Sequence, residues 1–242
     1  MRAGGADRIP VGLVYRSPTV YRWAMRILDP ASAEDLRVVA EVIEPGSSVI
    51  DLCCGDAAIA PLLLERNCRY LGLELNPRFV QSGRRRGLDV RAWDGRSQEI
   101  PEHADVVCIL SSLYQFIPGE RLLVEAMLRS ARRKVIVSEP VRNWSTSRWA
   151  ILRRVARAVT HVNGRVFEQR LDEDGLRELA RSFDDVEVEF VRRPRQLVCV
   201  LTHARPGAPQ PAENATARAV PPRPRTDRRP CAPRPAPRPR RR

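Results

Sequence analysis

Three acidic residues stand where apolar runs of the sequence end. Asp51 lies near the end of SSVIDL, Glu74 closes RYLGLE, and Asp94 follows the run that ends in RAW. A carboxylate accepts two hydrogen bonds side by side, which suits it to a pair of hydroxyl groups. Glu74 lies 19 residues after Gly55, near the offset of roughly 20 residues at which an acid contacts the ribose of a bound nucleoside. The spacing predicts a nucleoside site if the three runs are neighbouring strands.

A tight turn of small residues follows Asp51 in the stretch VIDLCCGDAAIAPLL. Gly55 has no Cβ, so a ligand can approach the backbone there closely. We expect a helix to begin at Asp56 and Ala57, and the first N–H groups of a helix have no partner within it. The pattern is typical of a turn that holds a ligand.

Short β-branched runs alternate with segments of helical period, which indicates an α/β domain with a largely parallel sheet. The runs predict strands at 47–52, 69–74, 88–93, 104–110, 133–138, 184–191 and 196–202, and helices at 33–43, 57–66, 77–86, 119–131, 146–160 and 173–182. Only residues 192–195 separate the last two strands. That connection is too short for a crossover helix, so these strands must form an antiparallel hairpin.

The segment DLCCGDA resembles motif I of the class I S-adenosylmethionine-dependent methyltransferases, D-x-G-x-G-x-G. Asp51 and Gly55 match the motif, whereas Cys53 replaces its first glycine and Ala57 its third. The resemblance covers residues 35–203 and implies an α/β, Rossmann-like fold. That fold has a seven-stranded, mostly parallel sheet of order 3-2-1-4-5-7-6, a terminal antiparallel hairpin, and helices on both faces.

The resemblance also implies S-adenosyl-L-methionine as the cofactor. In this family the acid at the position of Glu74 binds the ribose, and the acid at the position of Asp94 reaches the adenine amino group. Ser111 is expected near the methionine end of the cofactor. The expected cofactor-binding residues are Asp51, Cys53, Gly55, Asp56, Glu74, Leu75, Asp94, Gly95 and Ser111.

Motifs that the sequence lacks narrow the acceptor. The stretch LSSLYQFIP after the fourth strand differs from the N/D-P-P-Y/F sequence of enzymes that methylate amino groups of adenine or cytosine. Cys108 lies within that strand, so it is not placed as a nucleophile for cytosine C5. Lys134 is the only lysine, which excludes ribose methylation of the Lys-Asp-Lys-Glu type. We therefore expect a small-molecule acceptor.

Aromatic residues are expected at the open end of the sheet, where ligands of such folds bind. They would wall an acceptor pocket, or the segment SPTVYRWAMRIL would instead be an amphipathic cap on the sheet edge. The side chains of Arg142 and Asn143 could orient an anionic or carbonyl-bearing acceptor. The expected substrate-binding residues are Tyr15, Tyr21, Tyr114, Arg142 and Asn143, and the candidates for a general base are Tyr114, Glu139 and His161.

Most of the net charge of +13 lies in the C-terminal segment 205–242, which has 11 arginines, 11 prolines and two acids. A segment of this composition has little to bury and is expected to be disordered. It is either a dispensable solvated extension or a basic arm for nucleic acid or anionic lipid. We expect a cap segment at 1–32, the methyltransferase domain at 33–204 and this tail.

Several other classes of protein do not fit the sequence. No apolar run approaches the roughly 18 residues of a membrane helix, and the N-terminus has no signal-like stretch. None of the six cysteines is spaced as C-x-x-C, so we expect reduced thiols, no metal site and a cytoplasmic protein. Two alternatives stay open: a methyltransferase that uses the tail to act on RNA or protein, and a non-catalytic relative that binds a nucleoside.

Overall fold

A computed structural model describes residues 17–18, 32–97, 99–141, 170–194 and 196–204. The strands are β1 (Ser48–Leu52), β2 (Arg69–Glu74), β3 (Val90–Ala92), β4 (Ala104–Leu110), β5 (Ala131–Pro140), β6 (Val186–Arg192) and β7 (Gln196–His203). The helices are α2 (Ser32–Glu41), α3 (Ala60–Glu65), α4 (Pro77–Arg85), α5 (Glu120–Ser130) and α7 (Glu173–Arg181), with 3-10 turns η2 (Gly95–Ser97) and η3 (Leu113–Phe116).

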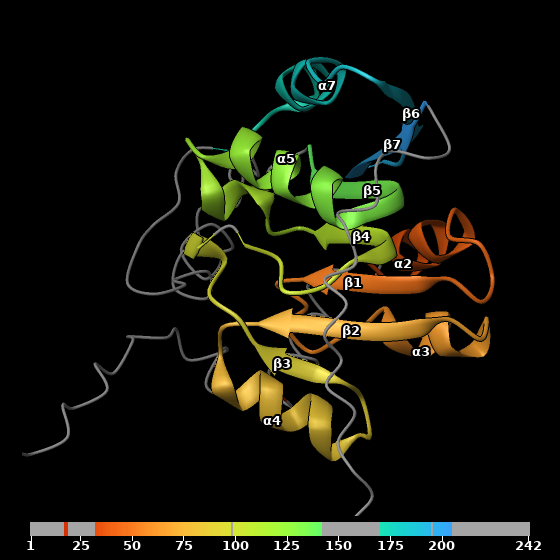
Figure 1. Cartoon of the computed structure of the whole chain (residues 1–242), viewed down its shortest axis with the longest axis vertical. Helices are drawn as coiled ribbons and strands as arrows, with labels where there is room; N and C mark the ends of the chain where they lie inside the picture. Colours follow the sequence, from red (N-terminus) through yellow and green to blue (C-terminus); the bar gives the residue numbers. More distant parts are fainter. Residues whose placement is uncertain (1–16, 19–31, 98, 142–169, 195, 205–242) are drawn as a thin grey trace, which may run out of the picture. The chain divides into compact units, whose positions relative to one another are not determined.

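All seven strands form one sheet of order β3-β2-β1-β4-β5-β7-β6, which Figure 1 shows from yellow β3 to blue β6. The first five strands are parallel to one another. β7 lies between β5 and β6 and is antiparallel to both. The predicted fold class, strand order and terminal hairpin are therefore confirmed, and each strand boundary lies within two residues of its expected place.

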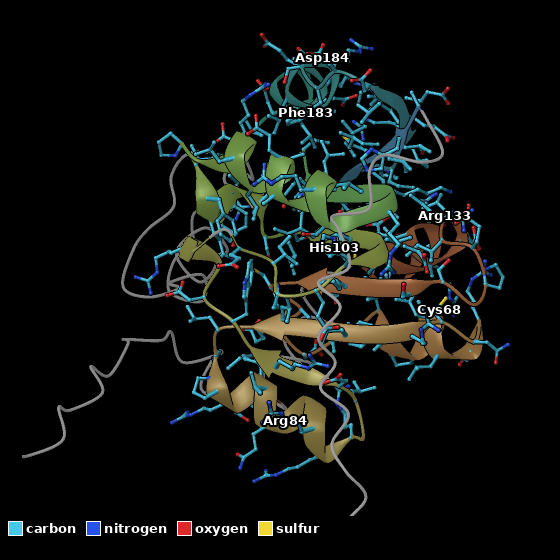
Figure 2. All side chains as sticks on the ribbon, in the orientation of Figure 1. Cys68, Arg84, His103, Arg133, Phe183 and Asp184 are labelled. Atoms are coloured by element: carbon cyan, nitrogen blue, oxygen red, sulfur yellow. The ribbon has the colours of Figure 1, made fainter. Side chains whose placement is uncertain are left out.

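Two apolar cores lie on the two faces of the sheet. Successive side chains of a strand point to opposite faces of the sheet, so Val49 belongs to one core and Ile50 to the other. Helices α2 and α3 pack on the first core, and α5 and α7 pack on the second. Phe183, labelled beside α7 in Figure 2, closes the second core and is 8% exposed. Helices therefore cover both faces, as expected.

Local sequence signals account for where the helices begin. Asn76 caps α4, because its side chain accepts a hydrogen bond from Arg78 N at 3.0 Å and Pro77 occupies the first turn. Asp172 caps α7 in the same way, accepting from Gly175 N at 2.8 Å. The prediction that a helix begins at Asp56 was wrong, because α3 starts at Ala60.

Asp56 and Ala57 belong to the turn before α3. The φ angle of Ala57 is 54°, a left-handed conformation that a right-handed helix cannot contain. The expected helix at 146–160, the cap at 1–32 and the tail at 205–242 lie outside the described residues, apart from residues 17–18 and 32, so the domain boundaries stay predictions.

The β6–β7 hairpin is tied to α2 by an ion-pair network. Arg193 donates to Glu34 at 2.5 Å and to Asp35 at 3.2 Å. Asp35 is only 5% exposed, so its pairing with Arg193 compensates a carboxylate that is largely removed from water. The network links the first described helix to the last part of the sheet.

Among the residues that the structure describes, no helix is long and apolar enough to cross a bilayer. Within the same residues, no three or more His, Cys, Asp or Glu side chains group so that they could hold a metal ion.

We predict that Gly83→Ala destabilises the protein although alanine favours helices. A Cβ at this position of α4 would lie 2.5 Å from Val90 Cγ2 on β3. The overlap should lower the free energy of unfolding by about 1 to 3 kcal/mol, the usual cost of overpacking a core. Urea denaturation measures it. Gln81→Ala, at an exposed position of the same helix, is the control and should change stability by less than about 0.5 kcal/mol.

Candidate active site at the carboxyl edge of the sheet

Strands β1 to β5 run parallel, so their carboxyl ends meet at one edge of the sheet. The ends of these strands place Asp51, Glu74, Asp94, Ser111 and Glu139 along that edge. This arrangement brings the acids at the first three strand ends to the edge where the sequence predicted a site. Figure 2 labels Cys68 and Arg133 at the opposite edge, where β2 and β5 begin.

The turn after β1 has a left-handed backbone at alternate residues. The φ angles of Cys53, Gly55 and Ala57 are 54°, 55° and 54°. These are the three positions at which motif I has glycine. Cys53 and Ala57 therefore adopt the glycine-like conformation that the motif requires, at a cost of roughly 1–2 kcal/mol for each non-glycine residue.

Glu74 holds this turn with its carboxylate. Its Oε2 accepts a hydrogen bond from Gly55 N at 2.8 Å, and its Oε1 accepts one from Asn76 N at 2.7 Å. Burial raises the pKa of Glu74, while the backbone hydrogen bonds from Asn76, Gly55 and Leu75 act to lower it. A carboxylate can accept about four hydrogen bonds in all, so three backbone N–H groups leave room for a hydroxyl group of a ligand.

Asp51 lies beneath the turn and is 2% exposed. Tyr70 donates its hydroxyl to Asp51 Oδ2 at 2.8 Å, and the thiol of Cys108 lies 3.8 Å from Oδ1. The pKa of Asp51 is raised to about 7, chiefly by burial; the hydrogen bond from Tyr70 opposes the rise, and the nearby charges of Glu74 and Asp56 contribute to it. Asp51 therefore titrates near neutral pH. Direct contact between Asp51 and a ligand stays a prediction.

Asp94 follows β3 on the exposed side of the edge. Its carboxylate pairs with Arg96 Nε at 3.0 Å and accepts from Arg96 N at 3.1 Å. Gly95 allows a close approach between η2 and η3, because a Cβ there would lie 2.6 Å from the ring of Phe116. The expected contacts of Asp94 and Gly95 with an adenine stay predictions, as do those of Leu75, which is partly buried after β2.

Glu139 and Tyr114 lie together on the other side of the turn. Glu139 is 4% exposed and accepts a hydrogen bond from Leu113 N at 2.6 Å, which anchors η3 to β5. Burial raises the pKa of Glu139 to about 7, against the effect of its backbone hydrogen bonds. The guanidinium of Arg170 lies over the ring of Tyr114, 4.0 Å from its centroid. Of the three candidate bases, Tyr114 thus lies in η3 and Glu139 beside it.

The third candidate base and most of the expected acceptor residues lie outside the described part of the chain. They are His161, Tyr15, Tyr21, Arg142 and Asn143. Their roles stay predictions.

Three residues whose side chains contact this site were not predicted. Gln196 reaches it because β7 is antiparallel and begins where β5 ends. Its Oε1 accepts from the Ser138 hydroxyl at 2.6 Å, and its Nε2 donates to Ser111 Oγ at 3.3 Å. The predicted hairpin could have indicated Gln196. No signal in the sequence pointed to Tyr70 or Arg170.

We predict that Asp51→Asn stabilises the protein at pH 8 more than at pH 4. The folded-state pKa of Asp51 is raised from 3.8 to about 7, so the acid contributes stability below pH 4 that is lost as pH rises through 7. The difference in effect between the two pH values should reach roughly 2 to 4 kcal/mol. Urea denaturation at pH 4 and pH 8 measures it, and an equal effect at both pH values would contradict the buried, titrating carboxylate.

Comparison with known proteins gives a family and a fold. The family described as methionine biosynthesis protein MetW matches residues 33–167. No match is found among the curated proteins.

Solved structures of methyltransferases share the fold. An O-methyltransferase family protein from Burkholderia thailandensis has a TM-score of 0.56 and 14% identity, over 77% of this chain and 59% of that one. Magnesium protoporphyrin IX methyltransferase from Synechocystis PCC 6803, with bound SAH, has a TM-score of 0.55 and 12% sequence identity, over 82% of this chain and 90% of that one. A SAM-dependent methyltransferase from Aquifex aeolicus has a TM-score of 0.55 and 13% sequence identity, over 77% of this chain and 98% of that one. The chain thus spans about three fifths of the first relative and nearly all of the other two.

Proposed function

The chain belongs to the MetW family, and we propose that it transfers a methyl group from S-adenosylmethionine to a small-molecule acceptor. The turn of residues 53–57 carries this proposal. Its backbone is left-handed at all three positions where motif I has glycine, and Glu74 holds the middle one. The two replaced glycines therefore do not remove the shape that the cofactor would need.

The residues of this edge fit the chemical groups of the cofactor. Glu74 would accept the ribose hydroxyls, Asp94 would accept from the adenine amino group, and Ser111 would line the methionine end. The backbone of the turn can approach the ligand closely at Gly55, where an added Cβ would meet no other atom within 4 Å. When bound, the cofactor supplies a methyl group on a positively charged sulfur. The buried acids Asp51 and Glu139 favour a positive charge at this edge.

The acceptor side of the proposed site is η3 and the end of β5. A base is most effective when its pKa lies near the working pH, and the pKa of Glu139 is about 7. The carboxylate of Glu139 also anchors Leu113 N, so its position is fixed relative to Tyr114. We propose that Glu139 accepts the proton of the acceptor group, with Tyr114 and Arg170 beside it.

The size and character of the acceptor follow from the same surroundings. The family description concerns methionine biosynthesis and names no acceptor, so the class is argued from the site. Tyr114 and Phe116 on η3 are aromatic and largely or partly buried, which suits an apolar or aromatic body. Arg170 offers a cation to a carbonyl or anionic group. We also propose Tyr15, Tyr21, Arg142 and Asn143 as residues that bind the acceptor and His161 as an alternative base. We propose a cytoplasmic location for the protein.

We predict that the protein binds S-adenosylmethionine and S-adenosylhomocysteine with micromolar affinity in calorimetric titration. Glu74→Ala should weaken both by roughly 1 to 3 kcal/mol, because it leaves the ribose hydroxyls and Gly55 N without their acceptor. Glu65→Ala, at an exposed position of α3, is the matched control and should bind as the wild type does. Failure of the folded wild type to bind either compound would overturn the proposed function.

We predict that Glu139→Gln lowers the rate of methyl transfer at saturating cofactor at least about 100-fold, the usual contribution of a general base. The assay follows methylated product by mass spectrometry, after small aromatic acceptors have been screened with the wild type. The wild-type rate should rise with pH through about 7, the pKa of Glu139, and the variant should lose this limb. A variant with a normal rate would restrict Glu139 to anchoring η3. A wild type that binds the cofactor and methylates no acceptor would favour the non-catalytic alternative.

A further inference from the structure

We propose that Tyr70 is a positioning residue of the cofactor site: its hydroxyl holds the Asp51 carboxylate beneath the turn of residues 53–57 and keeps it negatively charged while the cofactor binds. This inference rests on the proposed function. It assigns a role to a buried residue of β2 that motif I does not contain.

The missing side chain at Gly72 makes the contact possible. Gly72 is the register partner of Asp51 on the neighbouring strand, two residues after Tyr70. A Cβ at Gly72 would lie 3.0 Å from the Tyr70 hydroxyl and 2.7 Å from Cys54 Sγ. The phenol and the thiol therefore occupy the space that a side chain at this position would fill. Tyr70 reaches across it to Asp51 Oδ2 at 2.8 Å.

The same place joins the carboxylate to the turn. Cys54 belongs to the turn, and its backbone N–H donates to Leu73 O of β2 at 3.1 Å. Its side chain packs where the Tyr70 hydroxyl lies. A shift of that hydroxyl would therefore move both Asp51 and Cys54. Cys54 lies between Cys53 and Gly55, two residues whose left-handed backbone shapes the turn.

Tyr70 is the strong hydrogen-bond donor to this carboxylate. Among the described residues, the other donor is the Cys108 thiol from β4, a weak one at 3.8 Å. In the same part of the chain, Glu74 from β2 and Asp56 from the turn also act on Asp51, and both disfavour its negative charge. The thiols of Cys53 and Cys54 are uncharged, because burial raises the pKa of each well above its usual range.

A negative charge on Asp51 matters for a cationic ligand. S-adenosylmethionine carries a positive sulfur, so its binding beside a buried carboxylate favours the ionised form of that carboxylate, and the ionised form favours binding in return. Burial holds the pKa of Asp51 near 7, so removing the hydrogen bond from Tyr70 should leave the group mostly protonated at neutral pH.

The test is calorimetric titration of S-adenosylmethionine into wild type and Tyr70→Phe at pH 6.5, 7.5 and 9. The ratio of the two affinities at each pH cancels the titration of the ligand. Loss of the hydrogen bond should raise the pKa of Asp51 by about one unit, so the variant should bind up to roughly tenfold more weakly at pH 6.5 and within about twofold of wild type at pH 9.

Cys199→Ala is the matched control for loss of a buried side chain, because Cys199 is fully buried on β7, a strand that does not pair with β1. It should change the affinity by less than twofold at every pH. Gly72→Ala is a second variant that keeps the phenol and displaces it, and it should reproduce the pH dependence of Tyr70→Phe. Urea denaturation of each variant shows whether it is folded under the conditions of the titration.

The outcomes separate this inference from the proposed function. If the wild type binds the cofactor and Tyr70→Phe binds equally well, or more weakly by the same factor at every pH, the inference is overturned and the proposed function stands. Recovery of affinity at pH 9 supports it, since a purely structural defect would not be repaired by pH. If the folded wild type does not bind, the proposed function fails and this inference fails with it.

Discussion

The site depends on a turn whose backbone is left-handed at residues 53, 55 and 57. Only glycine adopts this conformation without steric cost, and only Gly55 of the three is glycine. The turn is therefore held from outside. Glu74 accepts the amide of Gly55, the backbone of Cys54 is paired with β2, and the strands on both sides of β1 fix the residue that leads into the turn.

Two acidic side chains at this edge are buried, although protein interiors ordinarily exclude charged groups. Asp51 and Glu139 are almost fully buried without a cation within ion-pair distance in the described part of the chain, and burial raises the pKa of both to about 7. Their hydrogen bonds come from Tyr70 and from the backbone of η3. Buried acids with raised pKa values are common at functional sites. The positive charge of Arg170 already favours the ionised form of Glu139, and a cationic ligand would favour the ionised form of both acids.

The parallel sheet and its terminal hairpin could be predicted from patterns that the sequence displays, and the order of the strands from the resemblance to the methyltransferases. The alternation of runs indicated a parallel sheet, and the short link before Gln196 required a hairpin. Spacing placed Asp51 and Glu74 at one edge. The start of α3 could not be predicted from composition, since Ala57 is a good helix former whose left-handed backbone is imposed by the turn. The contact of Tyr70 with Asp51 depends on register across two strands, and a single sequence does not display it.

The packing of the two residues that replace glycine explains why this turn tolerates side chains. Ala57 is 1% exposed and belongs to the core under α2 and α3. Cys53 packs against the opposite core, under α5 and α7. Each side chain thus buries apolar surface that glycine would not, and this gain offsets part of the roughly 1–2 kcal/mol that a left-handed residue costs. Because the two residues pack on opposite faces of the sheet, the turn between them is clamped by both cores, and its shape is coupled to the packing of the whole domain.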